Sequence, residues 1–184
     1  LLLGLLSGCA GTTASSPDQE ATVSKALPDF DSWWDYGDPA ATQARFETLR
    51  AGLEAATDAD YRLQLLTQIA RTLGLQGRFD EAHLLLDEVE SSLDAPPSVA
   101  RVRYLLERGR ALRSSGKSAQ ATPLFEEAFA VGRRIGADYH AVDAAHMVAL
   151  AVDSTEARRH WSLLGIEIAA TSAQPRARHW LGSI

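Results

Sequence analysis

The sequence predicts an all-α protein: an α-solenoid of antiparallel helix pairs preceded by a flexible tether. Three observations predict this fold class. Apolar residues recur at helical spacing from Asp38 onward, and the strict alternation typical of strands is absent. Ala, Leu, Arg and Glu dominate this region, whereas β-branched residues, which favour strands, are sparse. A pattern of small and apolar residues also repeats along the chain, as expected of stacked helix pairs.

Composition limits the function classes before any motif is considered. The chain has 184 residues, of which 46% are hydrophobic and 23% are charged, as is typical of a soluble, folded protein. Its formal net charge of −6 argues against nucleic acid as a partner, because nucleic-acid-binding domains are usually basic. A single cysteine excludes a disulfide framework and a zinc site built on cysteines.

Residues 1–8 are expected to be the remnant of a secretory signal. The chain begins with a nearly continuous run of leucines, followed by small residues and by the one cysteine, Cys9. The four residues that end there, LSGC, resemble the bacterial lipobox. This resemblance implies that the signal is cut before Cys9 and that Cys9 is the site of lipid attachment. An ordinary leucine-rich helix that contains a cysteine is the alternative.

Residues 9–37 are expected to comprise the lipidated cysteine and a flexible tether. Positions 11–26 are small, polar and rich in turn-forming residues, as a linker requires. The two positions after the cysteine lack the aspartate that retains some lipoproteins at the inner membrane, so analogy favours the outer membrane. The aromatic cluster Trp33-Trp34-Asp35-Tyr36 ends the tether. We expect it to cover the exposed end of the first helices; docking to a partner or to the membrane interface is the alternative.

Residues 38–184 are expected to form the helical repeat domain, with about three helix pairs and partial repeats. The domain begins at Asp38-Pro39, where aspartate is a favourable N-cap and proline suits the first helical position. The last ten residues look like the start of a further first helix, entered through Pro175, with Trp180 where a capping repeat would be polar. We therefore expect the natural protein to continue beyond this chain, or the chain to be a fragment.

The repeated pattern resembles the tetratricopeptide repeat over about residues 61–172. The first copy matches best, and its most specific piece is the run GRFDEA that begins at Gly77. The second copy follows 39 residues later (Leu66 to Leu105), and the third is degenerate because Val152 replaces the turn glycine. The resemblance implies helix pairs stacked into a superhelix, with a concave groove lined by the first helix of each pair.

Small residues stand where paired helices would meet. Gly109 lies in mid-helix, where it costs about 1 kcal/mol relative to alanine, so we expect another helix to approach closely there. Asp80, Ser118 and Ser154 stand where the second helices need N-caps. Pro123 is expected just inside its helix, with a slight bend.

Transferred to this chain, the geometry of the family predicts a groove on the first helices. The residues expected to bind a partner there are Arg71, Arg103, Leu106, Arg110, Arg113, Tyr139 and His146. The arginines make this groove basic within an acidic protein. We expect a protein or peptide partner, held through an acidic segment or a C-terminal carboxylate by bidentate arginine contacts. The alternative is that the arginines pair with neighbouring carboxylates such as Glu107.

The sequence contains no convincing motif for catalysis, a metal or a cofactor. Gly116-Lys117-Ser118 ends like a phosphate-binding loop, but Ala111 replaces the first glycine of that motif and the preceding segment is helical. The five histidines form no metal-binding motif, and they are expected to make surface hydrogen bonds. We therefore expect a protein that is not an enzyme and that uses no cofactor and no metal.

These inferences combine into one function with two alternatives. We expect a lipoprotein of the bacterial cell envelope, anchored to the membrane, that presents a tetratricopeptide scaffold for protein–protein interaction or for assembly of an envelope complex. One alternative is a soluble, cytoplasmic regulator built from the same repeats. The other is the recruiting domain of a larger enzyme.

Overall fold

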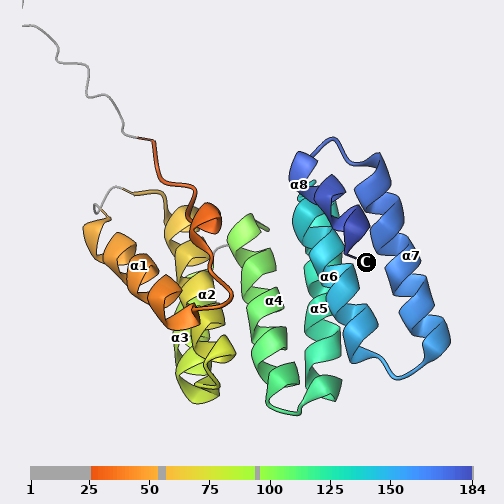
Figure 1. Cartoon of the computed structure of the whole chain (residues 1–184), viewed down its shortest axis with the longest axis horizontal. Coiled ribbons are helices and arrows are strands. Elements are labelled where there is room, and N and C mark those ends of the chain that lie inside the picture. The colour runs from red at the N-terminus through yellow and green to blue at the C-terminus, as the bar shows by residue number, and fades with distance from the viewer. Residues whose placement is uncertain (1–25, 54–56, 94–95, 184) are drawn as a thin grey trace, which may run out of the picture.

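The structure, a computed structural model, describes residues 26–53, 57–93 and 96–183 (Figure 1). Cys9 and the rest of the expected signal segment lie outside these ranges. The described residues form eight α-helices, two short 3-10 helices and no strand. The α-helices are α1 (Pro39–Gly52), α2 (Ala59–Leu75), α3 (Phe79–Ser91), α4 (Val99–Ser114), α5 (Ser118–Arg134), α6 (Asp138–Ala151), α7 (Thr155–Thr171) and α8 (Pro175–Arg178), and the 3-10 helices are η1 (Phe30–Trp33) and η2 (His179–Gly182).

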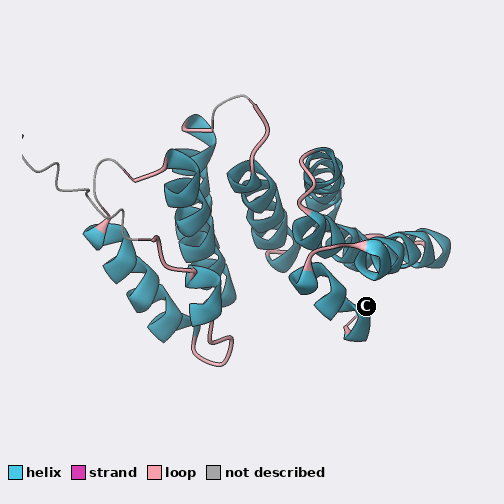
Figure 2. Cartoon of the chain, turned by 90° about the horizontal axis from the view of Figure 1, so that it is seen from above, coloured by secondary structure: helices cyan, strands magenta, loops and turns pink. Residues whose placement is uncertain are grey.

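Consecutive helices pack against each other along the molecule, which confirms the predicted all-α, solenoid-like fold (Figures 1 and 2). After α1, the chain forms the pairs α2 with α3, α4 with α5, and α6 with α7. The first helices of these pairs also contact one another, α2 with α4 and α4 with α6. Among the described helices, none combines the length and the apolar character that crossing a bilayer requires.

Three turns between helices share one construction, in which a glycine adopts a left-handed conformation. Gly77, Gly116 and Gly136 have φ angles of 75°, 84° and 70°, which side-chain-bearing residues rarely adopt. Beyond each glycine, the next backbone N–H reaches back to a carbonyl of the preceding helix, as the N–H of Arg78 does to Leu73 at 3.0 Å. The turn after α6 differs, because Val152 is extended there.

The helix starts follow the expected capping in part. Asp38 and Ser154 each accept a hydrogen bond from the backbone N–H three residues ahead, as predicted for N-caps. The predictions for Asp80 and Ser118 are wrong, because both residues lie within the first turn of their helices. The N-cap positions there have no side-chain hydrogen bond. Each glycine turn therefore leads into the next helix without a separate capping residue.

The hydrophobic core runs between the paired helices through the whole array. Phe46, Leu105 and Phe125 are among its largest fully buried side chains. Gly109 makes the close helix approach that its position predicts, since a β-carbon built there would lie 2.4 Å from Cε1 of Phe125. Removal of this apolar surface from water is the main contribution to the stability of such an array.

The described part of the expected tether, residues 26–37, packs on the helices. The Phe30 side chain is 4% exposed, and its ring centroid lies 6.1 Å from that of Phe46 and 5.1 Å from that of Tyr61. Trp34 meets Phe46 edge-on, so this part of the aromatic cluster covers the first helices, as expected. Phe30 and Trp34, which belong to the stretch expected to be a tether, are thus packed on the array, because burial of these rings offsets the loss of chain freedom.

Candidate functional site

The predicted groove residues lie around two neighbouring hollows on the face formed by α2, α4 and α6. Arg110 and Arg113 border an open groove of about 170 Å³, which Arg71 also borders. His146 lines neither hollow, and its ring centroid lies 5.4 Å from that of Trp180. The other predicted residues line a second, larger hollow of about 340 Å³, here called the cavity: Arg71, Arg103, Leu106 and Tyr139.

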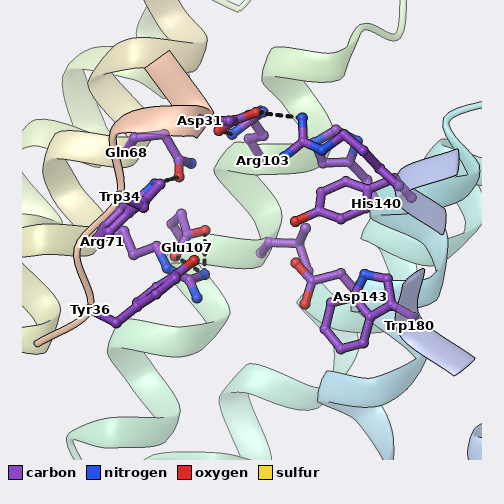
Figure 3. A pocket seen from close by; sticks show the side chains of 13 residues that line it. Asp31, Trp34, Tyr36, Gln68, Arg71, Arg103, Glu107, His140, Asp143 and Trp180 are labelled. Atoms are coloured by element: carbon purple, nitrogen blue, oxygen red, sulfur yellow. Dashed lines mark hydrogen bonds and ion pairs between the residues drawn. The ribbon is translucent and has the colours of Figure 1, made fainter. Parts of the chain in front are cut away.

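Two segments from outside the helix pairs form part of the cavity wall (Figure 3). The N-terminal segment around η1 contributes Asp31, Trp34 and Tyr36, and the C-terminal segment of α8 and η2 contributes Arg176 and Trp180. The cavity therefore lies between the helical array and both ends of its described chain. The other lining residues come from α2, α4 and α6 and are Gln68, Glu107, His140 and Asp143.

Asp31 joins the two closing segments to the array. Its carboxylate accepts hydrogen bonds from Arg103 Nη1 at 3.0 Å and from Arg176 Nη1 at 3.0 Å, and it also contacts Arg103 Nη2. The Arg103 and Asp31 side chains are only 8% and 11% exposed, whereas that of Arg176 is about half exposed. Because Asp31 and Arg176 are 145 positions apart, this ion pair links the two ends of the described chain.

A second set of ion pairs is centred on Glu107 of α4, which is buried. Its carboxylate accepts hydrogen bonds from Arg71 at 3.1 Å and from Arg110 at 2.7 Å. Arg110 also contacts the carboxylate of Asp143 on α6. These contacts link α2, α4 and α6. They agree with the alternative that neighbouring carboxylates pair with the groove arginines, although Arg103 pairs with Asp31 rather than with Glu107.

Burial and pairing together decide the charge of these groups. Burial alone would raise the pKa of Asp31 and of Asp143, but hydrogen bonds and the charge of adjacent arginines outweigh it and lower both pKa values. Burial acts to lower the pKa of Arg71, but the carboxylate of Glu107 outweighs it and raises that pKa. All of these groups are therefore charged at neutral pH.

His140, in the same environment, is kept uncharged. Burial lowers its pKa to about 4, and the positive charge of Arg103 contributes to the shift, so the imidazole is neutral at pH 7. Its Nε2 is buried and has no hydrogen-bond partner among the described residues, and the same is true of the Nε atoms of Arg71 and Arg103. The polar network around the cavity is thus incomplete, which is uncommon for buried polar atoms.

Aromatic rings form the rest of the cavity wall. Trp34 and Tyr36 stack with centroids 4.9 Å apart and an interplanar angle of 8°, and the guanidinium carbon of Arg71 lies 5.6 Å from each centroid. The ring of Tyr139 lies 6.3 Å from that of Trp180. The cavity therefore combines paired charges with flat apolar surfaces.

The open groove differs from the cavity because exposed aliphatic side chains, and no aromatic ring of the described residues, border it. Leu75 of α2 and Leu150 of α6 border it and are 51% and 46% exposed. Arg113 lies at its edge, in the last turn of α4, and forms no ion pair with any described residue. The groove thus presents apolar surface beside an unpaired positive charge.

The repeat pattern in the sequence does not predict the residues that complete the cavity wall. Asp31, Arg176 and Trp180 belong to segments outside the helix pairs, and the repeat register gives such segments no place in a groove. The aromatic cluster that includes Trp34 and Tyr36 is the one sequence feature that points to this region, and it favours packing on the first helices over binding of a ligand. In the described ranges, no group of three or more histidine, cysteine or acidic residues is arranged to hold a metal ion.

Comparison with models of known families, with curated proteins and with solved structures gives no match for this chain. The function is therefore inferred from the geometry and chemistry of the two hollows.

Proposed function

We propose that this protein is a non-catalytic interaction module, built like a tetratricopeptide array, that binds a protein segment in the open groove. One observation carries the proposal: the exposed side chains of Leu75 and Leu150 lie beside the unpaired Arg113 in one groove. Exposed apolar side chains gathered in a hollow and rimmed by charge are characteristic of interaction sites.

The charges of the groove indicate the chemistry of the partner. Arg71 and Arg110 already share the carboxylate of Glu107, so Arg113 is the arginine left for a partner. Arg103 is occupied by Asp31, so it does not contribute to this surface. The complementary ligand is an amphipathic peptide with leucine-like side chains for the groove and acidic residues for its arginine edge.

We extend the proposal to the location of the protein. The lipobox-like LSGC sequence supports a lipid anchor at Cys9 and a role in assembling complexes of the bacterial envelope. A cytoplasmic regulator and the recruiting domain of a larger enzyme are the alternatives. Palmitate labelling that is lost in Cys9→Ala would support the anchor, and a lack of label in both chains would contradict it.

A charge-exchange experiment tests the groove. The probe is a fluorescent helical peptide with leucines four residues apart, flanking glutamates and an amidated C-terminus; its binding to the full chain is followed by fluorescence anisotropy. We expect Arg113→Glu to weaken binding about tenfold or more, because an attractive contact becomes a repulsive one. A peptide with lysines in place of the glutamates should bind this variant better than it binds the wild type.

The matched control is Arg134→Glu, which makes the same change of charge at an exposed position in the last turn of α5. This variant should bind the acidic peptide as the wild type does. Equal losses in the two variants, or no binding of the acidic peptide by the wild type, would contradict the proposal.

A further inference from the structure

The cavity is a second site, which the interaction module does not require. We propose that this cavity binds a carboxylate group carried on a flat, apolar body. Such a group belongs to a small organic acid or to the C-terminal residue of a polypeptide, and the chemistry of recognition is the same for both. The inference does not rest on the proposed function, because only Arg71 and Glu107 border both hollows.

The charges around the cavity favour a ligand with one negative charge. The ion-paired set consists of the charged residues that line the cavity (Arg71, Arg103, Arg176, Asp31, Glu107 and Asp143) and of Arg110, which borders the groove and pairs with Glu107 and Asp143. It therefore has one positive charge in excess. Because much of this set is shielded from water, the excess charge acts more strongly than it would at the surface. A monoanion balances it, whereas a dianion such as sulfate would reverse its sign.

Unused nitrogen donors around the cavity call for a ligand that accepts hydrogen bonds. Arg71 binds Glu107 through Nη1 alone, and its Nη2 has no hydrogen-bond partner among the described residues. Arg176 likewise reaches Asp31 through Nη1 alone. Arginine has donors and no acceptor, so only an acceptor can complete these contacts. The two oxygens of a carboxylate match the two-pronged geometry of a guanidinium group.

The cavity walls indicate what carries the carboxylate. Figure 3 shows Trp34 and Tyr36 on one side of the cavity and Trp180 on the other. The nearly parallel rings of the first two offer flat apolar surface against which a planar group can pack. A volume of about 340 Å³ equals that of roughly eleven water molecules. This is room for a ring as well as a carboxylate, so an aromatic acid fits the cavity better than acetate does.

Isothermal titration calorimetry on the full chain tests this inference. The probes are 3-phenylpropionate, the peptide Gly-Gly-Gly-Phe with a free C-terminus, and the neutral amide of each. We expect the acids to bind about tenfold or more tightly than their amides, because the amides lack the charge that the arginines recognise. Tighter binding of the peptide acid would identify a polypeptide C-terminus as the source, and tighter binding of phenylpropionate would identify a small acid.

Three outcomes would overturn the inference: equal affinity for acids and amides, sulfate binding as tightly as the acids, or no heat from either acid at millimolar concentration. The last result would mean that the cavity holds water alone. The groove peptide described above has an amidated C-terminus, so the failure of one proposal is distinguishable from the failure of the other.

Two variants connect the binding to this cavity. Arg71→Gln removes one guanidinium group and leaves Glu107 paired with Arg110, so it should weaken binding of the acids about tenfold or more and leave the amides unchanged. Tyr36→Ala removes a wall side chain that is 62% exposed, so the fold should persist while acids and amides bind more weakly alike. Arg134→Gln, on the exposed end of α5, is the matched control and should bind as the wild type does. Undiminished acid binding by Arg71→Gln would refute the assignment.

Discussion

At the scale of single residues, the behaviour of each group depends on whether it has a partner in the folded protein. Asp31 and Asp143 stay charged although they are buried, because arginines offset the loss of water. His140 has no hydrogen-bond partner for its Nε2 and is kept neutral by burial, with a pKa of about 4. His140 therefore takes up a proton at a higher pH in the unfolded chain than in the folded chain.

This difference predicts a loss of stability in mild acid. The unfolded chain takes up a proton at His140 near the ordinary pKa of 6.5, whereas the folded chain does so near 4. The stability contributed by the neutral imidazole is present above pH 6.5 and is lost as the pH falls from 6.5 to 4, by at most about 3 kcal/mol. His140→Phe should remove this part of the pH dependence, as measured by urea unfolding across that range.

The other histidines provide the comparison for His140→Phe. The pKa values of His83 and His146 are also lowered by burial, so a smaller dependence should remain in His140→Phe. His160→Phe, at an exposed position on α7, should leave the wild-type profile unchanged. If the profiles of wild type and His140→Phe coincide between pH 6.5 and 4, the buried neutral imidazole is refuted.

At the scale of helices, periodicity and small residues predict most of what the structure shows. Local sequence patterns predict the helix pairs, their glycine turns and the contact at Gly109. Each of these features involves residues that are close in sequence or that occupy equivalent positions in the repeats. The starts of α3 and α5 were predicted less well. A glycine turn uses only one further residue, Arg78 or Lys117, before the next helix begins, which leaves no position for a separate cap.

The contact at Gly109 predicts a substitution that opposes helix propensity. Gly109→Ala should destabilise the protein by about 1 kcal/mol or more, because strain against buried Phe125 exceeds the gain from a better helix former. Gly74→Ala is the control on α2, where a β-carbon would meet nothing within 4 Å, and it should stabilise by up to about 1 kcal/mol. Denaturant unfolding measures both. A stabilising Gly109→Ala would show that α4 and α5 are not in close contact.

The same reasoning explains which part of the cavity could be predicted. Arg71, Arg103, Leu106 and Tyr139 come together because they recur on the first helices of successive pairs. Asp31 and Arg176 share no such register, and they approach one another only because the η1 and α8 segments both pack on the helical array. A repeat pattern gives the spacing along the paired helices, and it does not give the placement of short helices outside the repeats.

At the scale of the whole molecule, the ion pairs of Asp31 tie the ends of the array to its middle. The two pairs differ in their surroundings. The pair with Arg103 is shielded from water, whereas Arg176 is about half exposed. The pair with Arg103 should therefore contribute more to the free energy of unfolding than the pair with Arg176, because solvent weakens exposed ion pairs.

Two substitutions separate these contributions. Asp31→Ala should destabilise the protein by about 3 kcal/mol or more, because Arg103 is left buried without its carboxylate. Arg176→Ala should cost at most about 1 kcal/mol, since water replaces the partner of an exposed group. Thermal and urea unfolding measure the two losses. Equal losses would show that Arg103 is as accessible to water as Arg176.

The separation of Asp31 and Arg176 also has a consequence for how the protein is made. A ribosome adds about 5–20 residues each second, so Arg176 is synthesised on the order of ten seconds after Asp31. During that interval the η1 segment and the first helix pairs can fold, while the side of the cavity formed by α8 and η2 is still missing. The cavity therefore takes its final form only after α8 and η2 have been synthesised, when most of the residues that line it are already in place.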